Sequence, residues 1–136
     1  MAINDIQISD NFKLSEFQSS GDGSVKIHRK LLELLQSVRS DIDQPMIINS
    51  AYRDIEYNRK VGSNDNSQHV KGTAADISLI NLELDANKLA DVVENKADEL
   101  EIGRGSLGLG LYDNFVHIDV RGLIGDEAPA RWDNRT

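Results

Sequence analysis

Two segments carry residues that could bind a metal ion together. The first, residues 67–76, places the imidazole of His69 in a loop that contains glycine and the carboxylate of Asp76 in the extended segment that follows. The second, residues 115–120, contains His117. Zinc in hydrolases commonly takes three nitrogen or oxygen ligands from the protein and leaves a fourth position to water, whose pKa falls to about 7. His69, Asp76 and His117 could supply such a ligand set.

The alternation of residues 115–120 indicates which way His117 points. In an extended strand, Phe115, His117 and Asp119 share one face, and the apolar residues Val116 and Ile118 lie on the other. Because the apolar face packs on a core, we expect His117 to face a cleft. Spacing alone leaves a second interpretation open, since a histidine beside an aspartate is more often a hydrogen-bonded pair than a metal ligand.

Composition limits the classes of protein to which the chain can belong. It has 136 residues, 39% of them hydrophobic, which is enough for one core, and we expect a single domain over residues 1–136. The formal net charge of -8 argues against nucleic acid as a partner. With no cysteine, a zinc site must use His, Asp or Glu. No apolar run is long enough to span a membrane, and we expect a monomer that binds no membrane.

Periodicity predicts two helices and four strands. Apolar residues recur at helical spacing over residues 25–42 and again over residues 85–100, where Asp85 can cap the helix and Gly103 can end it. Strands are predicted at residues 46–49, 74–80, 108–112 and 115–120, and a turn at Asp113 and Asn114 joins the last two. Because helices and strands do not alternate strictly, we expect an α+β architecture with a mainly antiparallel sheet and helices packed on one side.

Several separated motifs resemble those of one family. Residues 67–76 match Ser-x-His-x-x-Gly-x-Ala-x-Asp at every fixed position, and this pattern is similar to the signature of D-alanyl-D-alanine metallopeptidases. Residues 49–53 resemble the family's strand ending in a tyrosine-arginine pair, and residues 115–121 resemble its last ligand strand. Residues 11–17 resemble the opening of the peptidoglycan-peptidase branch found in phage lysins and bacterial genomes. The matches imply the fold that these peptidases share with the hedgehog signalling domain.

The resemblance also implies roles for individual residues. His69, Asp76 and His117 carry over as the zinc ligands. Arg53 carries over as a catalytic and substrate-binding cation, because its planar fork can pair with a terminal carboxylate or a developing oxyanion. Ser67 carries over as a residue that can hydrogen-bond to the substrate.

Three of the residues in these motifs have a plainer interpretation as well. Arg53 could form a surface salt bridge with Asp54 or Glu56 instead. Ser67 could serve only to form the turn that it occupies. Trp132 resembles a family ending in which an aromatic residue closes over the sheet, so that core packing and a platform for substrate are both open.

One position departs from the family pattern. Many members carry a glutamate three positions before the last histidine ligand as the general base, and Asn114 stands there in this chain. An amide cannot accept that proton. Asp119 is the first substitute because it shares a face with His117, but it could equally orient a ligand histidine by accepting a hydrogen bond from it. Asp113 and Tyr112 are the further candidates.

These matches imply zinc-dependent hydrolysis of a peptide bond in the stem or cross-link peptide of bacterial peptidoglycan, by a carboxypeptidase or an endopeptidase. Residues 1–10 do not resemble a secretory signal, so we expect synthesis in the cytoplasm and action on the cell wall, either after phage-mediated release, as for an endolysin, or as a tail-borne phage enzyme. The hedgehog signalling domain, which keeps a zinc site while serving recognition, suggests a second hypothesis. By that analogy the chain would be a zinc-retaining module that binds cell wall or protein without turnover.

Overall fold

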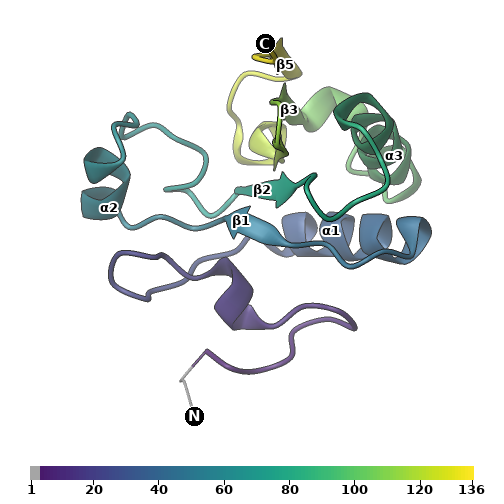
Figure 1. The fold of residues 1–136 in the computed structure, drawn as a ribbon. Coiled ribbons are helices and arrows are strands. Elements are labelled where there is room, and N and C mark those ends of the chain that lie inside the picture. The colour runs from purple at the N-terminus through teal and green to yellow at the C-terminus, as the bar shows by residue number, and fades with distance from the viewer. Residues whose placement is uncertain (1–3) are drawn as a thin grey trace.

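A mixed sheet with strand order β1-β2-β4-β3-β5 organises the computed structural model, which describes residues 4–136 (Figure 1). The strands are β1 (Ile48–Ser50), β2 (Ala74–Ser78), β3 (Gly108–Leu111), β4 (Phe115–Asp119) and β5 (Ala130–Asp133). The helices are α1 (Arg29–Ile42), α2 (Ile55–Lys60) and α3 (Ala86–Glu99), with 3-10 turns η1 (Leu14–Phe17), η2 (Arg104–Ser106) and η3 (Arg121–Ile124). The first three residues of the amino-terminal segment 1–10 lie outside the described residues.

Antiparallel pairing dominates the sheet. β2 pairs with β1 and β4, β3 pairs with the other edge of β4, and each of these pairs is antiparallel. Within residues 4–136 the one parallel pair is β3 with β5. The predicted α+β class with a mainly antiparallel sheet is confirmed. The register of β2 on β4 places Asp76 directly opposite His117, which brings the two sequence segments of the candidate site together.

The sheet has one apolar face and one polar face. Helices α1 and α3 lie side by side and cover the apolar face (Figure 1). The side chains that the sheet contributes to the core beneath them are Ala75, Ile77, Leu109, Leu111, Val116, Ile118 and Val120. Val116 and Ile118 are fully buried, so the predicted inward packing of the alternate apolar residues in β4 is confirmed. The polar positions of β2 and β4 therefore lie on the opposite face of the sheet.

Both predicted helices are present, and α3 has its predicted cap. The carboxylate of Asp85 accepts a hydrogen bond from the backbone N–H of Lys88 at 2.8 Å, which satisfies one of the free amides of the first turn. The prediction that Gly103 ends this helix is wrong. The helix ends at Glu99, and Glu101 takes the left-handed backbone conformation, with φ of 62°, before the chain reaches the glycine.

Helix α1 starts later than its apolar pattern predicts. Ile27 fits the helical stripe, but the helix begins at Arg29. His28 occupies the cap position, where its Nδ1 accepts the backbone N–H of Lys30 at 3.0 Å. An imidazole can cap a helix in this way although it is not among the preferred capping side chains.

The hairpin of β3 and β4 is confirmed, with the backbone N–H of Tyr112 donating to the carbonyl of Phe115 across the turn. The strand predicted at residues 46–49 begins two residues later and ends one residue later, at Ser50, and the strand predicted at residues 74–80 ends at Ser78. Periodicity did not predict α2 and β5, which are too short to show a repeat. In the part of the chain that the structure describes, no helix has the length and apolar character needed to cross a membrane.

Candidate metal centre

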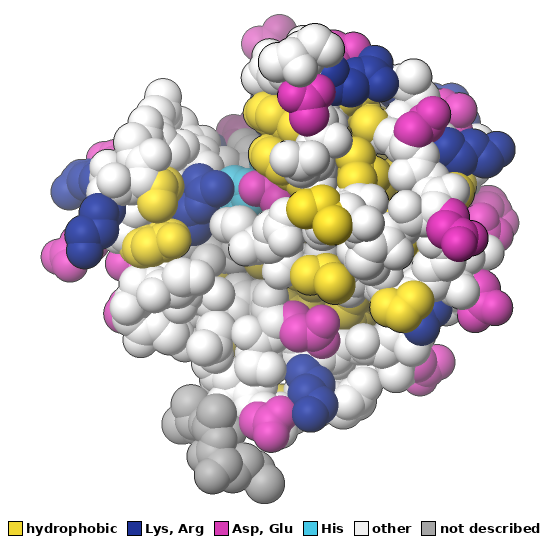
Figure 2. Space-filling model, in the orientation of Figure 1, with side chains coloured by type: hydrophobic (Ala, Val, Ile, Leu, Met, Phe, Trp, Pro, Cys, Tyr) yellow, Lys and Arg dark blue, Asp and Glu magenta, His cyan; other side chains and the backbone are white. Residues whose placement is uncertain are grey.

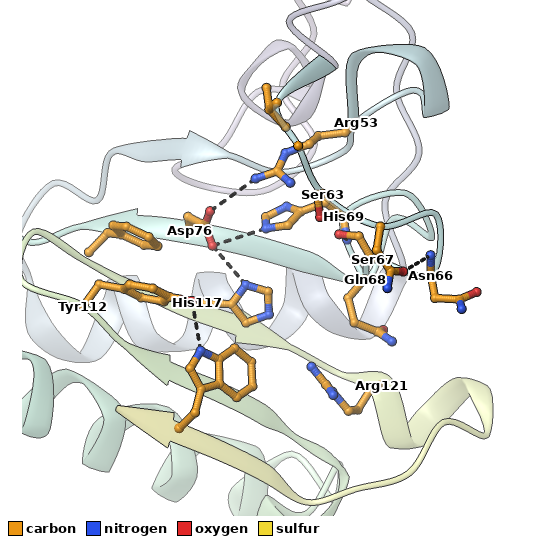
Figure 3. A pocket seen from close by; sticks show the side chains of 15 residues that line it. Arg53, Ser63, Asn66, Ser67, Gln68, His69, Asp76, Tyr112, His117 and Arg121 are labelled. Atoms are coloured by element: carbon orange, nitrogen blue, oxygen red, sulfur yellow. Dashed lines mark hydrogen bonds and ion pairs between the residues drawn. The ribbon is translucent and has the colours of Figure 1, made fainter. Parts of the chain in front are cut away.

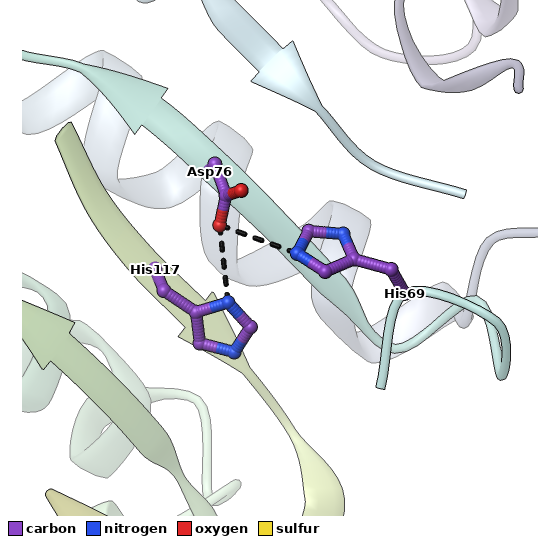
Figure 4. A group of neighbouring side chains, drawn as sticks. All are labelled: His69, Asp76 and His117. Atoms are coloured by element: carbon purple, nitrogen blue, oxygen red, sulfur yellow. Dashed lines mark hydrogen bonds and ion pairs between the residues drawn. The ribbon is translucent and has the colours of Figure 1, made fainter. Parts of the chain in front are cut away.

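His69, Asp76 and His117 meet on the polar face of the sheet (Figure 4). One ligand atom of each lies within 4.8 Å of the others, and all three side chains are buried. Oδ1 of Asp76 lies 3.0 Å from Nδ1 of His117 and 3.3 Å from Nε2 of His69. Asp76 and His117 come from paired strands, and His69 comes from the loop before β2. The structure thus brings together all three of the predicted ligand residues.

Hydrogen bonds outside this group determine which nitrogen of each imidazole faces Asp76. Nδ1 of His69 lies 2.6 Å from the backbone carbonyl oxygen of Ala51, so this nitrogen carries a proton and donates it. Nε2 of His117 lies 2.7 Å from Oδ2 of Asp119 and donates in the same way. In neutral imidazoles the two nitrogens that face Asp76 then carry lone pairs. Three electron-pair donors therefore converge, and a divalent cation fits such a set of nitrogen and oxygen donors.

Protons compete for the same lone pairs. Burial by itself would raise the pKa of the Asp76 carboxyl, but hydrogen bonds from His117 and His69 hold that pKa well below its usual range. Burial by itself would lower the pKa of His117, but its hydrogen bonds to Asp119 and Asp76 raise that pKa. Since a metal ligand must be deprotonated, acid is expected to weaken metal binding at this site.

The three residues line a cleft of about 670 Å³. Figure 2 shows histidine at the back of a hollow, with a basic and an acidic side chain beside it, between the part of the molecule that contains α2 and the part that contains β5. One wall is the polar loop of residues 61–68, and the other consists of Tyr112, Phe115 and Trp132. A peptide could therefore reach the histidines from solvent.

Arg53 enters the cleft from the end of β1 (Figure 3). Its Nη2 lies 3.9 Å from Oδ2 of Asp76, and its Nε and Nη1 donate to Ser50 Oγ and Asn58 Oδ1, each at 3.2 Å. Asn58 is fully buried and also donates to the carbonyl of Asn64 in the polar wall, at 2.8 Å. Among the described residues Arg53 forms no salt bridge with Asp54 or Glu56, which was the plainer interpretation. Instead, partly buried hydrogen bonds hold its guanidinium beside the candidate metal ligands.

Asp119 lies behind His117 and is fully buried. Besides His117, it contacts Arg121, whose Nε donates to Oδ1 at 3.0 Å and whose Nη2 donates to Oδ2 at 2.8 Å. Burial by itself would raise the pKa of the Asp119 carboxyl, but hydrogen bonds from His117 and Arg121 lower it to about 2. Gly108 of β3 lies across from this carboxylate, where a Cβ atom would collide with both of its oxygens. Both oxygens of Asp119 are therefore engaged by neighbouring donors.

The aromatic wall is held by its own contacts. Nε1 of Trp132 donates to the hydroxyl of Tyr112 at 2.9 Å, and the Trp132 ring centroid lies 5.2 Å from that of His117. The rings of Tyr112 and Phe115 stack with centroids 4.2 Å apart. A Cβ atom at Gly110 would collide with the indole, so the glycine lets the ring lie against β3. Trp132 is half-buried and lines the cleft, so it does more than fill the core.

The remaining predicted residues lie in two different places. Ser67 lines the cleft, and its Oγ accepts the backbone N–H of His69 at 3.2 Å, so it is both a turn residue and within the site. Asn114 is exposed in the hairpin turn and is not among the residues that line the cleft. Asp113 is directed to the carboxyl terminus, where it accepts hydrogen bonds from Thr136. Tyr112 is thus the only one of the reserve candidates for the base that lines the cleft.

Sequence reasoning missed Arg121, Asn58 and the two glycines of β3. Arg121 follows the last ligand strand, and its position two residues after Asp119 is the signal that could have identified the ion pair. Gly108 and Gly110 alternate with leucine in a strand, a pattern that indicates close approach of other groups to one face. Asn58 carried no signal, because α2 was not predicted.

The fold and this site together define an α+β protein with a buried His-Asp-His group in a cleft on the open face of its sheet. The model of the peptidase M15 family matches residues 10–119, which is most of the chain. The chain therefore belongs to this family, and the resemblance to D-alanyl-D-alanine metallopeptidases is confirmed.

A solved structure shows the same fold. It is the L-Ala D-Glu endopeptidase ChiX of Serratia marcescens, which is 15% identical, with a TM-score of 0.53 over 69% of this chain and 80% of that one. The search of curated proteins finds no match. At this identity the likeness to ChiX extends to the fold alone.

Proposed function

We propose that this chain is a zinc-dependent peptidase that hydrolyses a peptide bond in the stem or cross-link peptide of bacterial peptidoglycan. The observation that carries the proposal is the convergence of His69, Asp76 and His117 in an open cleft of a peptidase M15 chain. Both imidazoles direct a lone pair at Asp76, so these residues suit zinc. When bound, zinc supplies polarisation of the scissile carbonyl and activation of water.

Arg53 binds the substrate in this proposal. Its guanidinium is only partly exposed in the cleft and is held by Ser50 and Asn58, so little side-chain entropy is lost when it takes up a ligand. A planar fork of donors suits a peptide carboxylate or the oxyanion that develops at the scissile carbonyl. Ser67 lies on the same side of the cleft and offers its hydroxyl proton to the peptide backbone.

Asp119 positions His117 rather than accepting a proton from water. The carboxylate is fully buried behind the imidazole, and its oxygens already accept hydrogen bonds from His117 and Arg121. A general base needs a pKa near the operating pH, whereas the pKa of Asp119 is lowered to about 2. These features favour the second of the two roles that the sequence left open, in which the carboxylate keeps the proton of His117 on Nε2.

Metal content tests the proposal without any assumption about the substrate. We expect about one zinc ion per chain, as three protein ligands imply. His69→Ala, Asp76→Ala and His117→Ala should each lose most of this zinc. His28→Ala is the matched control, because it removes the remaining histidine of the chain, which caps α1.

Activity is tested with muropeptides from several cell-wall types, with and without a chelator. We expect products whose formation stops with the chelator and resumes when zinc is restored. If none of the cell-wall types gives a chelator-sensitive product, the peptidase proposal is wrong. Mass spectrometry of the products distinguishes a carboxypeptidase, which releases a terminal residue, from an endopeptidase.

A binding module that retains zinc without turnover is the second candidate function. Asn114 favours it, because the usual carboxylate base is replaced and, among the described residues that line the cleft, only Asp76 has a carboxylate. Binding to sacculi without any turnover would support this function. Turnover that is lost in His117→Ala while the fold is kept would exclude it.

We further propose that the chain acts as an endolysin, as a monomer that reaches the cell wall after phage-mediated release. The support is the resemblance of residues 11–17 to the opening of the peptidoglycan-peptidase branch found in phage lysins and bacterial genomes. Sedimentation of the purified protein tests the monomer. An encoding gene far from any phage genes would rule out the endolysin assignment but leave the proposed chemistry untouched.

A further inference from the structure

Arg121 is the second arginine of the cleft, and it lies on the other side of the His-Asp-His group from Arg53 (Figure 3). Its Nε and Nη2 are occupied by Asp119. Its Nη1 has no hydrogen-bond partner within residues 4–136, and the side chain is 22% exposed. Positioning of Asp119 thus uses one edge of the guanidinium and leaves donors available to a ligand in the cleft.

The guanidinium is held in place before any ligand arrives. The two bonds to Asp119 fix its inner edge, and its Cζ lies 5.5 Å from the ring centroid of Trp132, close enough for a cation–π contact. Trp132 is itself held by the hydrogen bond from its Nε1 to the hydroxyl of Tyr112, and its ring lies against Gly110, which has no side chain. A preorganised fork of donors binds a carboxylate at a low cost in conformational entropy.

The distribution of charge also indicates an anionic ligand. The chain has a net charge of -8, yet the charged side chains that line the cleft are two arginines and one aspartate. That aspartate, Asp76, is a candidate metal ligand, and a bound divalent ion would make the cleft more positive still. An acidic protein that places two arginines around its reactive centre suits a substrate with more than one carboxylate.

We propose that Arg121, seated on Trp132, binds a second carboxylate of the peptide substrate, on the other side of the scissile bond from the carboxylate that Arg53 binds. This inference rests on the proposed peptidase function and narrows its substrate class. The substrate is a peptide with a free carboxylate on each of the two residues that flank the cleaved bond. Conversion of either carboxylate to an amide weakens recognition.

The test uses three synthetic peptides that differ only in these groups: one with both carboxylates, and two in which one or the other is an amide. With the wild-type zinc protein we expect kcat/KM to fall roughly 10–100-fold for each amide, the value of a hydrogen bond between charged groups. Arg121→Gln should abolish the preference for carboxylate over amide at one of the two substrate positions and keep this preference at the other. Arg121→Lys should retain part of it. Arg131→Gln is the matched control, because it removes a charge from β5 that pairs with Glu94.

Two outcomes would overturn the inference. One is wild-type protein that cleaves all three peptides equally well, a result that needs no variant to fold. The other is Arg121→Gln protein that loses activity equally on all three peptides, because Arg121 would then act only by positioning Asp119. If Arg121→Gln does not fold, Arg121→Lys replaces it, and the inference is wrong if this variant discriminates at both positions as strongly as the wild type does.

Failure of the proposed function gives a different result, namely no cleavage of any of the peptides. Binding then decides the inference, and the fluorescence of Trp132, the one tryptophan of the chain, reports it. Tighter binding of the peptide with both carboxylates than of either amide supports the second subsite. Equal binding of the three peptides would exclude it.

Discussion

Asp119→Asn separates the two roles that a carboxylate behind a histidine can have. The substitution keeps the shape but replaces one oxygen by an NH2 group. If that group takes the place of Oδ2, it faces the donors Nε2 of His117 and Nη2 of Arg121, and in place of Oδ1 it faces Nε and the backbone N–H of Arg121. Either orientation sets donors against donors.

The least costly rearrangement changes the tautomer of His117. The amide can donate to Nε2 if the proton of the imidazole moves to Nδ1. Nδ1 is the nitrogen that faces Asp76 at 3.0 Å, so the proton would occupy the lone pair that a metal ion needs. We therefore expect zinc affinity to weaken roughly 10–100-fold, the range for loss of such a hydrogen-bond partner, which is about 1.4–2.7 kcal/mol.

The assay is a titration of zinc against a competing chromophoric chelator, for the wild type and the variant, followed by turnover at saturating zinc. Asp113→Asn is the control, because its carboxylate belongs to the adjacent turn and, among the described residues, accepts side-chain hydrogen bonds only from Thr136. Unchanged zinc affinity with turnover reduced about 10²–10⁴-fold would refute the tautomer argument and identify Asp119 as the base. Unchanged affinity together with unchanged turnover would exclude both roles.

Three further changes probe the walls of the cleft and its charge. Gly110→Ala should displace the ring of Trp132, which a shifted emission maximum would report, and should lower kcat/KM at unchanged zinc content; an unshifted spectrum would contradict this. Asn58→Ala removes the acceptor of Arg53 Nη1 and one of the two donors to the carbonyl of Asn64, so denaturant unfolding should show a loss of about 1–3 kcal/mol and KM should rise, whereas wild-type stability would argue against this hydrogen-bond network. The pKa of Asp119 is lowered to about 2, against about 3.9 when unfolded, so its contribution to the stability of the metal-free protein is complete above pH 4 and is lost as pH falls from about 4 to 2. The free energy of unfolding of Asp119→Asn should therefore fall less between about pH 4 and 2 than that of the wild type. An equal fall in the two proteins would show that other groups control acid unfolding.

The parts of the site that could be predicted from sequence are those that follow from the alternation of side chains between the two faces of a strand. Alternation in residues 115–120 put His117 and Asp119 on the face away from the core, and this holds because Val116 and Ile118 each need burial. The family motif then selected His69 and Asp76 from among many polar residues. Neither source of information could give the register that sets Asp76 opposite His117, since register depends on the whole sheet.

Other parts of the site depend on contacts that no local pattern records. The polar wall and the position of Arg53 depend on Asn58, whose helix α2 has only six residues and starts at a cap, Asp54, that binds Tyr57 across one turn. The aromatic wall depends on the parallel pairing of β5 with β3, which brings the end of the chain back to its middle. Short elements of this kind are stabilised by tertiary contacts more than by their own propensity.

Gly108 and Gly110 show how the cleft depends on a face without side chains. Both positions on the polar face of β3 are glycine, and each leaves room for side chains that neighbouring segments supply. Gly108 admits the ion pair of Asp119 and Arg121, and Gly110 admits the ring of Trp132. A larger residue at either position would collide with these groups, of which Asp119 and Trp132 lie against His117. Strand β3 thus helps to shape the site because Gly108 and Gly110 have no side chains, although the strand contributes neither a candidate ligand nor a charge.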